Sequence, residues 1–248
     1  MKGILLRVGA DQTPAGGRYN APVDPHTWRY AYVPISAGED QYEHIAPCPT
    51  FAMFQQSVAN LDVTLPPHLD GHVKVHLDPD FDSLTYGEPY LSSSGRRASR
   101  GRLIQSLRPG DFIAFFAAFH PTNDAYEHTL AYCLFAIFFV HRVVQVSDLP
   151  LDLRSTCAHG RRRHALDDFV VQADPARSGR FPRAIPIGEF RDNAYRVRRD
   201  LLQAWGGLTV RNGYIQRSAN PPRFSNPAHF LAWLHRRPHT HPLRRHNQ

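Results

Sequence analysis

Three side chains that could perform chemistry alternate along one short segment, at His76, Asp78 and Asp80. Residues two apart on an extended strand point to the same side, so these three can converge on one site. A histidine beside carboxylates is suited to general acid–base catalysis. The His-x-Asp spacing is also the near pair of a metal-binding facial triad, whose second histidine comes from a distant part of the chain. The candidates for that distant ligand are His120, His128 and His141.

The two aspartates also have a structural explanation, because Asp78 and Asp80 can cap a turn that Pro79 makes rigid. The sequence leaves both interpretations open. We predict His76, Asp78 and Asp80 as catalytic residues, and we assign no metal ligand and no cofactor.

A glycine-rich loop forms the second candidate site. An apolar segment ends at Arg7, and glycines in the loop that follows let backbone N–H groups approach an anion closely. An arginine can pair with phosphate. The Asp11 carboxylate can accept a proton or bind the amino group of a base, or it can cap a turn. We predict Asp11 as a fourth catalytic residue, and a nucleotide-binding site made by Arg7, Gly16, Gly17, Asn20 and Tyr86.

Charge is divided unevenly along the chain. Residues 1–90 contain 5 basic and 11 acidic side chains (5 − 11 = −6), and residues 91–248 contain 24 basic and 11 acidic ones (24 − 11 = +13). A basic surface favours an anionic partner such as nucleic acid. We therefore expect the first third to supply the reactive pocket and the basic remainder to hold nucleic acid. The arginines predicted to contact it are Arg96, Arg97, Arg217 and Arg223.

The composition excludes several classes of protein. A hydrophobic fraction of 42% is too high for a disordered chain. The three cysteines lie far apart and predict neither a disulfide framework nor a cysteine zinc site. The longest apolar run, residues 131–140, is far shorter than the about 20 residues that span a bilayer. P-loop, Rossmann glycine, nucleophile-elbow and HExxH motifs are absent from the sequence. We therefore expect a cytoplasmic protein without a membrane segment.

Hydrophobic patterning predicts a mixed α+β fold with a mainly-β core. Apolar runs bounded by turn residues predict strands at 3–8, 29–35, 72–77, 112–119, 130–146, 169–173 and 184–187. Helical spacing predicts helices at 51–61, capped by Thr50, at 191–206 and at 230–234. We expect one domain over residues 1–234 and a disordered His- and Arg-rich tail over 235–248.

Two resemblances rest on these segments. The Pro109-Gly110-Asp111 turn that opens an apolar strand resembles the PUA-like barrels, which include the EVE and ASCH domains. On this resemblance, the expected mainly-β core could take the form of a PUA-like β-barrel with added helices. A larger set of blocks resembles the third of the nucleotide modification associated domains, a family named for its occurrence beside genes of DNA base hypermodification. The most specific block is HLDPDF at 76–81 with LTYG at 84–87, and the others lie at 7–11, 16–17, 20–24, 32–35, 107–112 and 184–187.

The family resemblance implies a protein of a nucleotide or DNA-base modification system that acts on a nucleotide or base. The alternative is a non-catalytic reader that binds a modified base in DNA, and a third hypothesis is a structural partner with no site. Nucleotides or nucleic acid are the implied partners, together with other proteins of the modification system. Geometry separates the hypotheses, because catalysis requires the four predicted catalytic residues to meet in one pocket.

Overall fold

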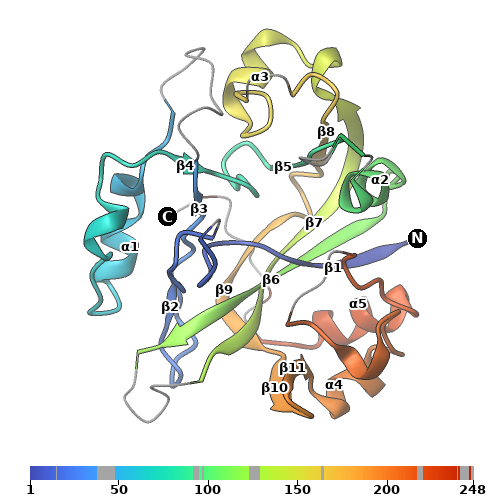
Figure 1. Ribbon diagram of the computed structural model, residues 1–248. Helices are drawn as coiled ribbons and strands as arrows, with labels where there is room; N and C mark the ends of the chain where they lie inside the picture. Colours follow the sequence, from blue (N-terminus) through green and yellow to red (C-terminus); the bar gives the residue numbers. More distant parts are fainter. Residues whose placement is uncertain are drawn as a thin grey trace.

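The computed structural model describes residues 1–14, 16–37, 48–91, 95–96, 98–122, 129–162, 165–216, 220–238, 240 and 246 (Figure 1). Seven strands within these residues form one mixed sheet in the order β1-β6-β7-β8-β5, with β2 paired to β6 and β9 paired to β7. Strand β1 runs parallel to β6, whereas β6, β7, β8 and β5 pair antiparallel in succession. The strands of this sheet are β1 Gly3–Arg7, β2 Pro22–Val23, β5 Thr85–Glu88, β6 Phe112–Pro121, β7 Ala131–Gln145, β8 Phe169–Ala173 and β9 Gly179–Pro186.

Two small antiparallel pairs and several short helices surround this sheet. The pairs join β3 to β4 and β10 to β11. Their bounds are β3 Ile35–Ser36, β4 Val75–His76, β10 Gly188–Arg191 and β11 Ala194–Val197. The α-helices are α1 Gln55–Ala59, α2 Ser99–Gln105, α3 Leu151–Thr156, α4 Arg199–Ala204 and α5 Pro227–His235. Single 3₁₀ turns lie at Phe51–Phe54, Pro67–Leu69, Val146–Asp148 and Arg211–Gly213.

The central strands β6 and β7 are apolar along almost their whole length because both faces of the sheet are covered. Alternate residues point to opposite faces of a strand. Ile113 and Phe115 accordingly join one buried cluster, whereas Phe112 and Phe116 join another. A sheet buried on both sides gives continuous apolar runs in place of an alternating pattern.

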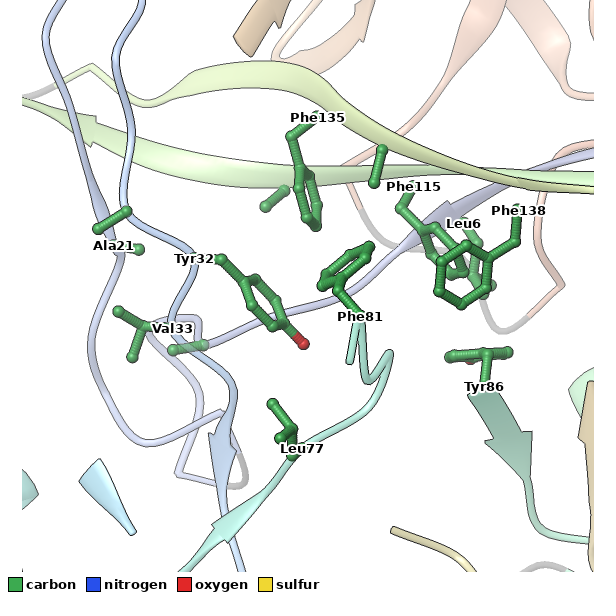
Figure 2. Close-up of a cluster of buried hydrophobic side chains, with 14 of the residues drawn as sticks. Leu6, Ala21, Tyr32, Val33, Leu77, Phe81, Tyr86, Phe115, Phe135 and Phe138 are labelled. Atoms are coloured by element: carbon green, nitrogen blue, oxygen red, sulfur yellow. The ribbon is translucent and has the colours of Figure 1, made fainter. Parts of the chain in front are cut away.

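The first cluster is rich in aromatic rings and supports the segment that leads to the candidate site. Phe81 lies between Tyr32 and Phe115, with ring centroids 5.4 Å and 6.5 Å away (Figure 2). Leu77 and Tyr86 are buried in the same cluster. These edge-to-face contacts add to the hydrophobic burial. They anchor residues 77, 81 and 86, so the polar residues between them are held in fixed positions.

The second cluster lies on the opposite face, under α4 and α5 (Figure 1). Phe230 of α5 stacks on Phe112 of β6 with ring centroids 5.4 Å apart. Asn226 caps helix α5, because its side chain accepts a hydrogen bond from the His229 N–H at 3.2 Å, and Pro227 follows at the first helical position. Asparagine as N-cap followed by proline is a strong helix start.

The structure confirms the mixed α+β fold with its mainly-β core. The ends of the main path, β1 and β5, do not pair with each other in the part of the chain that is described, so the sheet is open and does not form a closed PUA-like barrel. No helix of the described residues has the length and apolarity needed to cross a bilayer. The three cysteines are free thiols, as the sequence predicts.

Several predicted elements differ from the structure. The predicted helix at 191–206 is wrong, because β10 and β11 form a hairpin there and only Arg199–Ala204 is helical. The hairpin turns at Asp192 and Asn193, both with positive φ (50° and 57°), a conformation that Asp and Asn tolerate in tight hairpins. The predicted strand at 29–35 pairs as a named strand only at its end, in β3. The helix near residue 51 forms, but Thr50 makes no capping side-chain bond. Most of residues 239–248 lies outside the described residues, so the disordered tail stays a prediction.

Candidate functional site

The β4 strand places two of the predicted catalytic side chains on one side of the chain. His76 ends β4, Leu77 turns into the aromatic core, and Asp78 points back to the side of His76. The His76 Nε2 atom lies 3.8 Å from the Asp78 Oδ2 atom. The alternation expected for an extended segment is therefore present at these two positions.

Asp80 leaves this arrangement because the chain turns after Asp78. Its Oδ1 atom accepts hydrogen bonds from the N–H groups of Asp82, at 2.9 Å, and Ser83, at 3.2 Å. The backbones of Asp80 and Thr85 also bond to each other. Asp80 therefore caps this turn, the structural explanation that the sequence left open, and it is not among the residues that line the cavity with His76 and Asp78.

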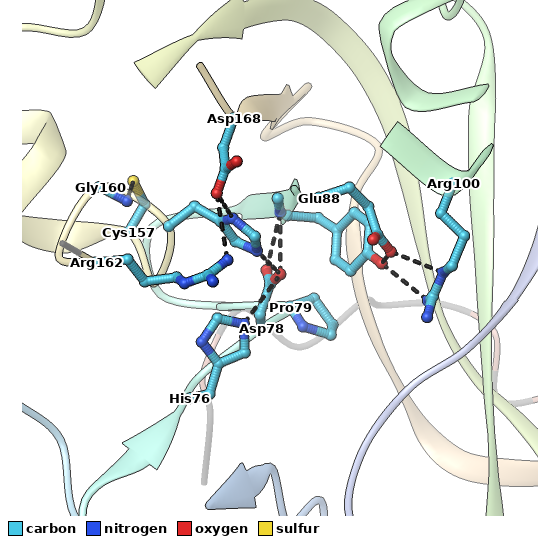
Figure 3. A network of polar contacts seen from close by, with 12 residues as sticks. His76, Asp78, Pro79, Glu88, Arg100, Cys157, Gly160, Arg162 and Asp168 are labelled. Atoms are coloured by element: carbon cyan, nitrogen blue, oxygen red, sulfur yellow. Dashed lines mark hydrogen bonds and ion pairs between the residues drawn. The ribbon is translucent and has the colours of Figure 1, made fainter. Parts of the chain in front are cut away.

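Asp78, Arg162 and Asp168 lie together (Figure 3), and His159, which follows α3, completes this group. Its Nε2 atom lies 3.4 Å from Asp78 Oδ2, and its Nδ1 atom lies 2.8 Å from Asp168 Oδ2. The Arg162 guanidinium contacts the same Asp168 oxygen at 3.3 Å. The Asp168 carboxylate also accepts the N–H of Tyr90 at 3.0 Å. His159 is thus held between two carboxylates, and Asp168 is itself fixed in place.

Gly87 of β5 contacts both Asp78 and His159. Its N–H donates to both oxygens of Asp78, at 3.0 and 3.1 Å. The His159 ring lies so close that a Cβ on Gly87 would come within 2.3 Å of His159 Cδ2. Only glycine therefore fits here while donating its N–H to the carboxylate.

Burial and mutual contacts shift the pKa values of the three central groups. Burial raises the pKa of Asp78 to about 6, against the opposing hydrogen bonds from His159 and Gly87. Burial lowers the pKa of His159, but hydrogen bonds to Asp168 and Asp78 and their negative charges outweigh it and raise the pKa to about 9. Burial, with the nearby charges of His159 and Arg162, holds the pKa of His76 well below its usual value. Near neutral pH, His159 is therefore charged and His76 is neutral.

A second polar group lies beside the first, around Glu88 and Arg100 (Figure 3). The Tyr86 hydroxyl donates to Glu88 Oε1, and Arg100 from α2 contacts both of these side chains. The Arg100 Nε atom lies 2.9 Å from Glu88 Oε1. Burial, reinforced by the negative charge of Glu88, raises the pKa of Tyr86 well above its ordinary value. Tyr86, predicted as a nucleotide contact, is therefore a neutral hydroxyl between a carboxylate and a guanidinium.

Both groups open into one cavity of about 520 Å³. The glycine-rich loop reaches the same cavity, so the two candidate sites predicted from the sequence share it. The polar lining residues are Arg7, Asp11, Thr13, His76, Asp78, Tyr86, Glu88, Arg100, His159 and Arg162. Apolar and backbone surface completes the walls, at Leu5, Leu6, Val8, Gly9, Gly16, Ile35, Gly87, Pro89, Phe116, Ile215, Pro221 and Pro222.

Asp11 lines the cavity and also holds the glycine-rich loop in place. Its Oδ1 atom accepts hydrogen bonds from the Thr13 N–H, at 2.8 Å, and the Thr13 hydroxyl, at 2.5 Å. Its Oδ2 atom lies 3.5 Å from Arg7 Nη2. Gly16 packs directly on this carboxylate, because a Cβ there would come within 1.9 Å of Oδ1. The carboxylate therefore caps the loop and orients Arg7 toward the cavity.

The remaining predicted residues lie elsewhere. Asn20 is buried and donates to the Ala118 carbonyl at 2.6 Å, and neither Asn20 nor Gly17 lines the cavity. Arg223 lines a neighbouring cavity of about 480 Å³ together with Arg102 and Asn220, and Pro221 lines both cavities. Arg96 is exposed and lines neither of them, whereas Arg97 and Arg217 lie outside the described residues.

His159, Asp168 and Arg162 were not among the site residues predicted from the sequence. Of the distant histidines named as candidate ligands, His120 and His141 are exposed on β6 and β7, and His128 lies outside the described residues. The only available signal was that His159 stands between two small residues, Ala158 and Gly160, beside the arginine run that begins at Arg161. The expectation that the first third of the chain supplies the pocket is wrong in part, because the later part contributes Arg100, His159 and Arg162. The expected nucleic-acid contact of the basic remainder stays a prediction.

The donor atoms of His76, Asp78 and His159 all lie within 4.8 Å of one another. Two imidazole nitrogens and one carboxylate oxygen form a donor set that binds divalent transition metals in proteins. The same atoms are also suited to passing a proton between histidine and aspartate.

Comparison with known proteins gives one result. Residues 2–221 match the family model described as nucleotide modification associated domain 3. No curated protein and no solved structure matches the chain.

Proposed function

The chain belongs to the nucleotide modification associated domain 3 family and so takes part in a nucleotide modification system, and from this premise we propose that it performs chemistry on a nucleotide or base held in the 520 Å³ cavity. One observation carries the proposal: the glycine-rich loop and the His76–Asp78 segment, far apart in the sequence, line the same cavity. A site built from separate segments, with titratable groups of shifted pKa, is typical of active sites.

The cavity offers separate surfaces for the parts of a nucleotide. Its volume lies within the range of about 300–1,000 Å³ that is usual for small-molecule sites. Arg7, Arg100 and Arg162 pair with Asp11, Glu88 and Asp168, yet keep 26%, 36% and 24% of their side-chain surface exposed. The guanidinium N–H groups that these pairs leave free can bind a phosphate. Apolar walls at Ile35, Pro89 and Phe116 suit the faces of a base. His76, Asp78 and His159 then act on the bound group.

A nucleotide within a longer strand also fits this arrangement. Helix α2 contributes Arg100 to the first cavity and Arg102 to the second, and Pro221 lines both. Phosphates that flank a bound nucleotide can lie along Arg102 and Arg223, because backbone contacts of this kind position a strand without reading its sequence.

Calorimetric titration tests nucleotide binding. The probes are the deoxynucleoside monophosphates and the matching nucleosides without phosphate. We expect the monophosphates to bind more tightly, and Arg7→Met to weaken them at least tenfold. Arg198→Met serves as the control, because Arg198 pairs with Asp200 on an exposed surface outside the cavity. Equal binding by Arg7→Met and the wild type would rule out Arg7 as a phosphate contact, and the same result for Arg100→Met and Arg162→Met would rule out the cavity as the phosphate site.

Mass spectrometry of nucleosides tests the chemistry. The protein, or its Asp78→Asn variant, is expressed together with its modification system, and the DNA and nucleotide pools are digested to nucleosides. We expect a modified nucleoside that depends on Asp78. If cells with the wild type and cells with Asp78→Asn contain the same modified nucleoside, and both proteins bind DNA that carries it, the non-catalytic reader is favoured.

A further inference from the structure

We propose that His76, Asp78 and His159 bind one divalent first-row transition metal ion that faces the nucleotide cavity. The inference deepens the proposed function by naming a cofactor for its reactive group. Its own test is metal binding without any nucleotide, so its failure and the failure of nucleotide binding are separate results.

The spacing of the donor atoms fits a metal ion. A tetrahedral ion about 2.1 Å from each donor separates the donors by roughly 3.4 Å. The Asp78 Oδ2 atom lies 3.4 Å from His159 Nε2 and 3.8 Å from His76 Nε2. The two imidazole rings are 5.2 Å apart between centroids and inclined at 71°, so they approach the carboxylate from different directions. The two histidine donors lie within 4.8 Å of each other, so a bound ion would draw them closer together.

Asp168 supplies an independent reason to infer a metal ligand at His159. A metal-binding histidine almost always donates its second ring N–H to a carboxylate, carbonyl or water, which fixes the ring and its tautomer. The His159 Nδ1 atom lies 2.8 Å from Asp168, while its Nε2 atom faces Asp78. A metal ion would take the position of an Nε2 proton in that contact. The Tyr90 N–H and the Arg162 guanidinium contact Asp168 in turn, so the carboxylate that orients His159 is itself fixed in position.

The surroundings favour a catalytic site over a structural one. A structural zinc site uses four protein ligands, whereas a catalytic site uses three and keeps open positions for water or substrate. In the described part of the chain, the group of histidine, cysteine and acidic side chains with metal-ligand spacing contains three members. All three line the cavity, so the open positions point to where the nucleotide would lie.

The test measures metal on the full-length protein without an affinity tag. Metal content is determined by mass spectrometry after purification, and affinity by titration of the chelator-treated protein with Zn²⁺, Fe²⁺ and Mn²⁺ under anaerobic conditions. Co²⁺ reports the coordination geometry through its visible spectrum. We expect one equivalent to bind tightly to the wild type, and at least a hundredfold weaker binding by His76→Ala and Asp78→Asn.

Matched controls separate this site from adventitious binding. His72→Ala removes an exposed histidine four residues from His76, and Asp70→Asn changes an exposed turn aspartate whose Oδ1 accepts the His72 N–H. Both should bind metal like the wild type. Histidines of the C-terminal segment can bind metal adventitiously, but they are present in every variant. The difference in metal affinity between variants therefore reports on the proposed site.

Asp168→Asn gives a second measurement if a ligand variant fails to fold. We expect it to bind the ion 10- to 100-fold more weakly with an altered Co²⁺ spectrum, since it keeps all three ligands and changes only the side chain that supports His159 and pairs with Arg162. Two results would overturn the proposal: a wild type that retains no tight equivalent of any of the ions, or the same tight equivalent in His76→Ala and Asp78→Asn.

Discussion

Replacing Gly87 by alanine tests whether His159 is locked in the position on which the site depends. The new Cβ would lie 2.3, 2.5 and 2.9 Å from His159 Cδ2, Cγ and Cβ, where an ordinary contact starts at 3.4 Å. The ring or the Gly87 backbone must therefore move by about 1.1 Å (3.4 − 2.3). Neither can do so freely, because Asp168 holds the ring and Asp78 holds the Gly87 N–H.

The expected loss follows from which contact breaks. A shift of this size carries a hydrogen bond of 2.8 or 3.0 Å beyond the limit for bonding. Losing one charge-assisted bond costs about 1.5–3 kcal/mol, and overpacking costs about 1–3 kcal/mol. Loss of the glycine's unfolded-state entropy returns roughly 0.5–1 kcal/mol. We expect the free energy of unfolding to fall by about 2–4 kcal/mol, a drop in Tm of roughly 4–16 °C.

Urea unfolding and metal titration measure the two consequences on the same variant. Metal affinity should fall 10- to 100-fold, as when the support of a ligating histidine is lost. Gly71→Ala is the control, because its nearest neighbours would be the flexible Gln55 amide at 3.2 Å and the Ala52 Cβ at 3.3 Å, which require a shift of only about 0.2 Å (3.4 − 3.2). A Gly87→Ala protein with wild-type Tm and wild-type metal affinity would refute the packing argument.

Three further substitutions test other parts of the structure. Phe135→Ala should lower the free energy of unfolding by about 3–5 kcal/mol in urea titration, because this fully buried ring contacts Tyr32 and Phe81; a loss below 1 kcal/mol would contradict the core. Asn226→Ala should lower it by about 1 kcal/mol, seen as a Tm drop of roughly 2–4 °C, because the cap of α5 is lost; an unchanged Tm would mean the cap contributes nothing. Asp80→Asn should keep metal affinity within about threefold of the wild type by calorimetry, since asparagine still accepts the two turn N–H groups; loss of the ion would place Asp80 in the site.

The central sheet could be predicted from sequence because its signals are local. The apolar runs of β6, β7 and β8 are bounded by turn residues, and strands were expected within two residues of where they form. The β10–β11 hairpin was missed because the pattern of apolar residues over 191–206 also matched helical spacing, although Asp192-Asn193 was a turn signal. The sequence could not show whether the sheet is open or forms a closed barrel, since this depends on pairing between strands that are distant in the sequence.

Some residues of the candidate site could likewise be predicted from the sequence, and others could not. The sequence alone determined the pair His76 and Asp78, because a strand places residues two apart on one side whatever lies around it. It also pointed to Arg7, Asp11, Gly16 and Tyr86, all of which reach the cavity. The folded structure was needed to show that Asp80 caps a turn and that His159, supported by Asp168, lies opposite Asp78. The physical reason is distance along the chain: about eighty residues separate Asp78 from His159, and the sheet and its aromatic core bring them together.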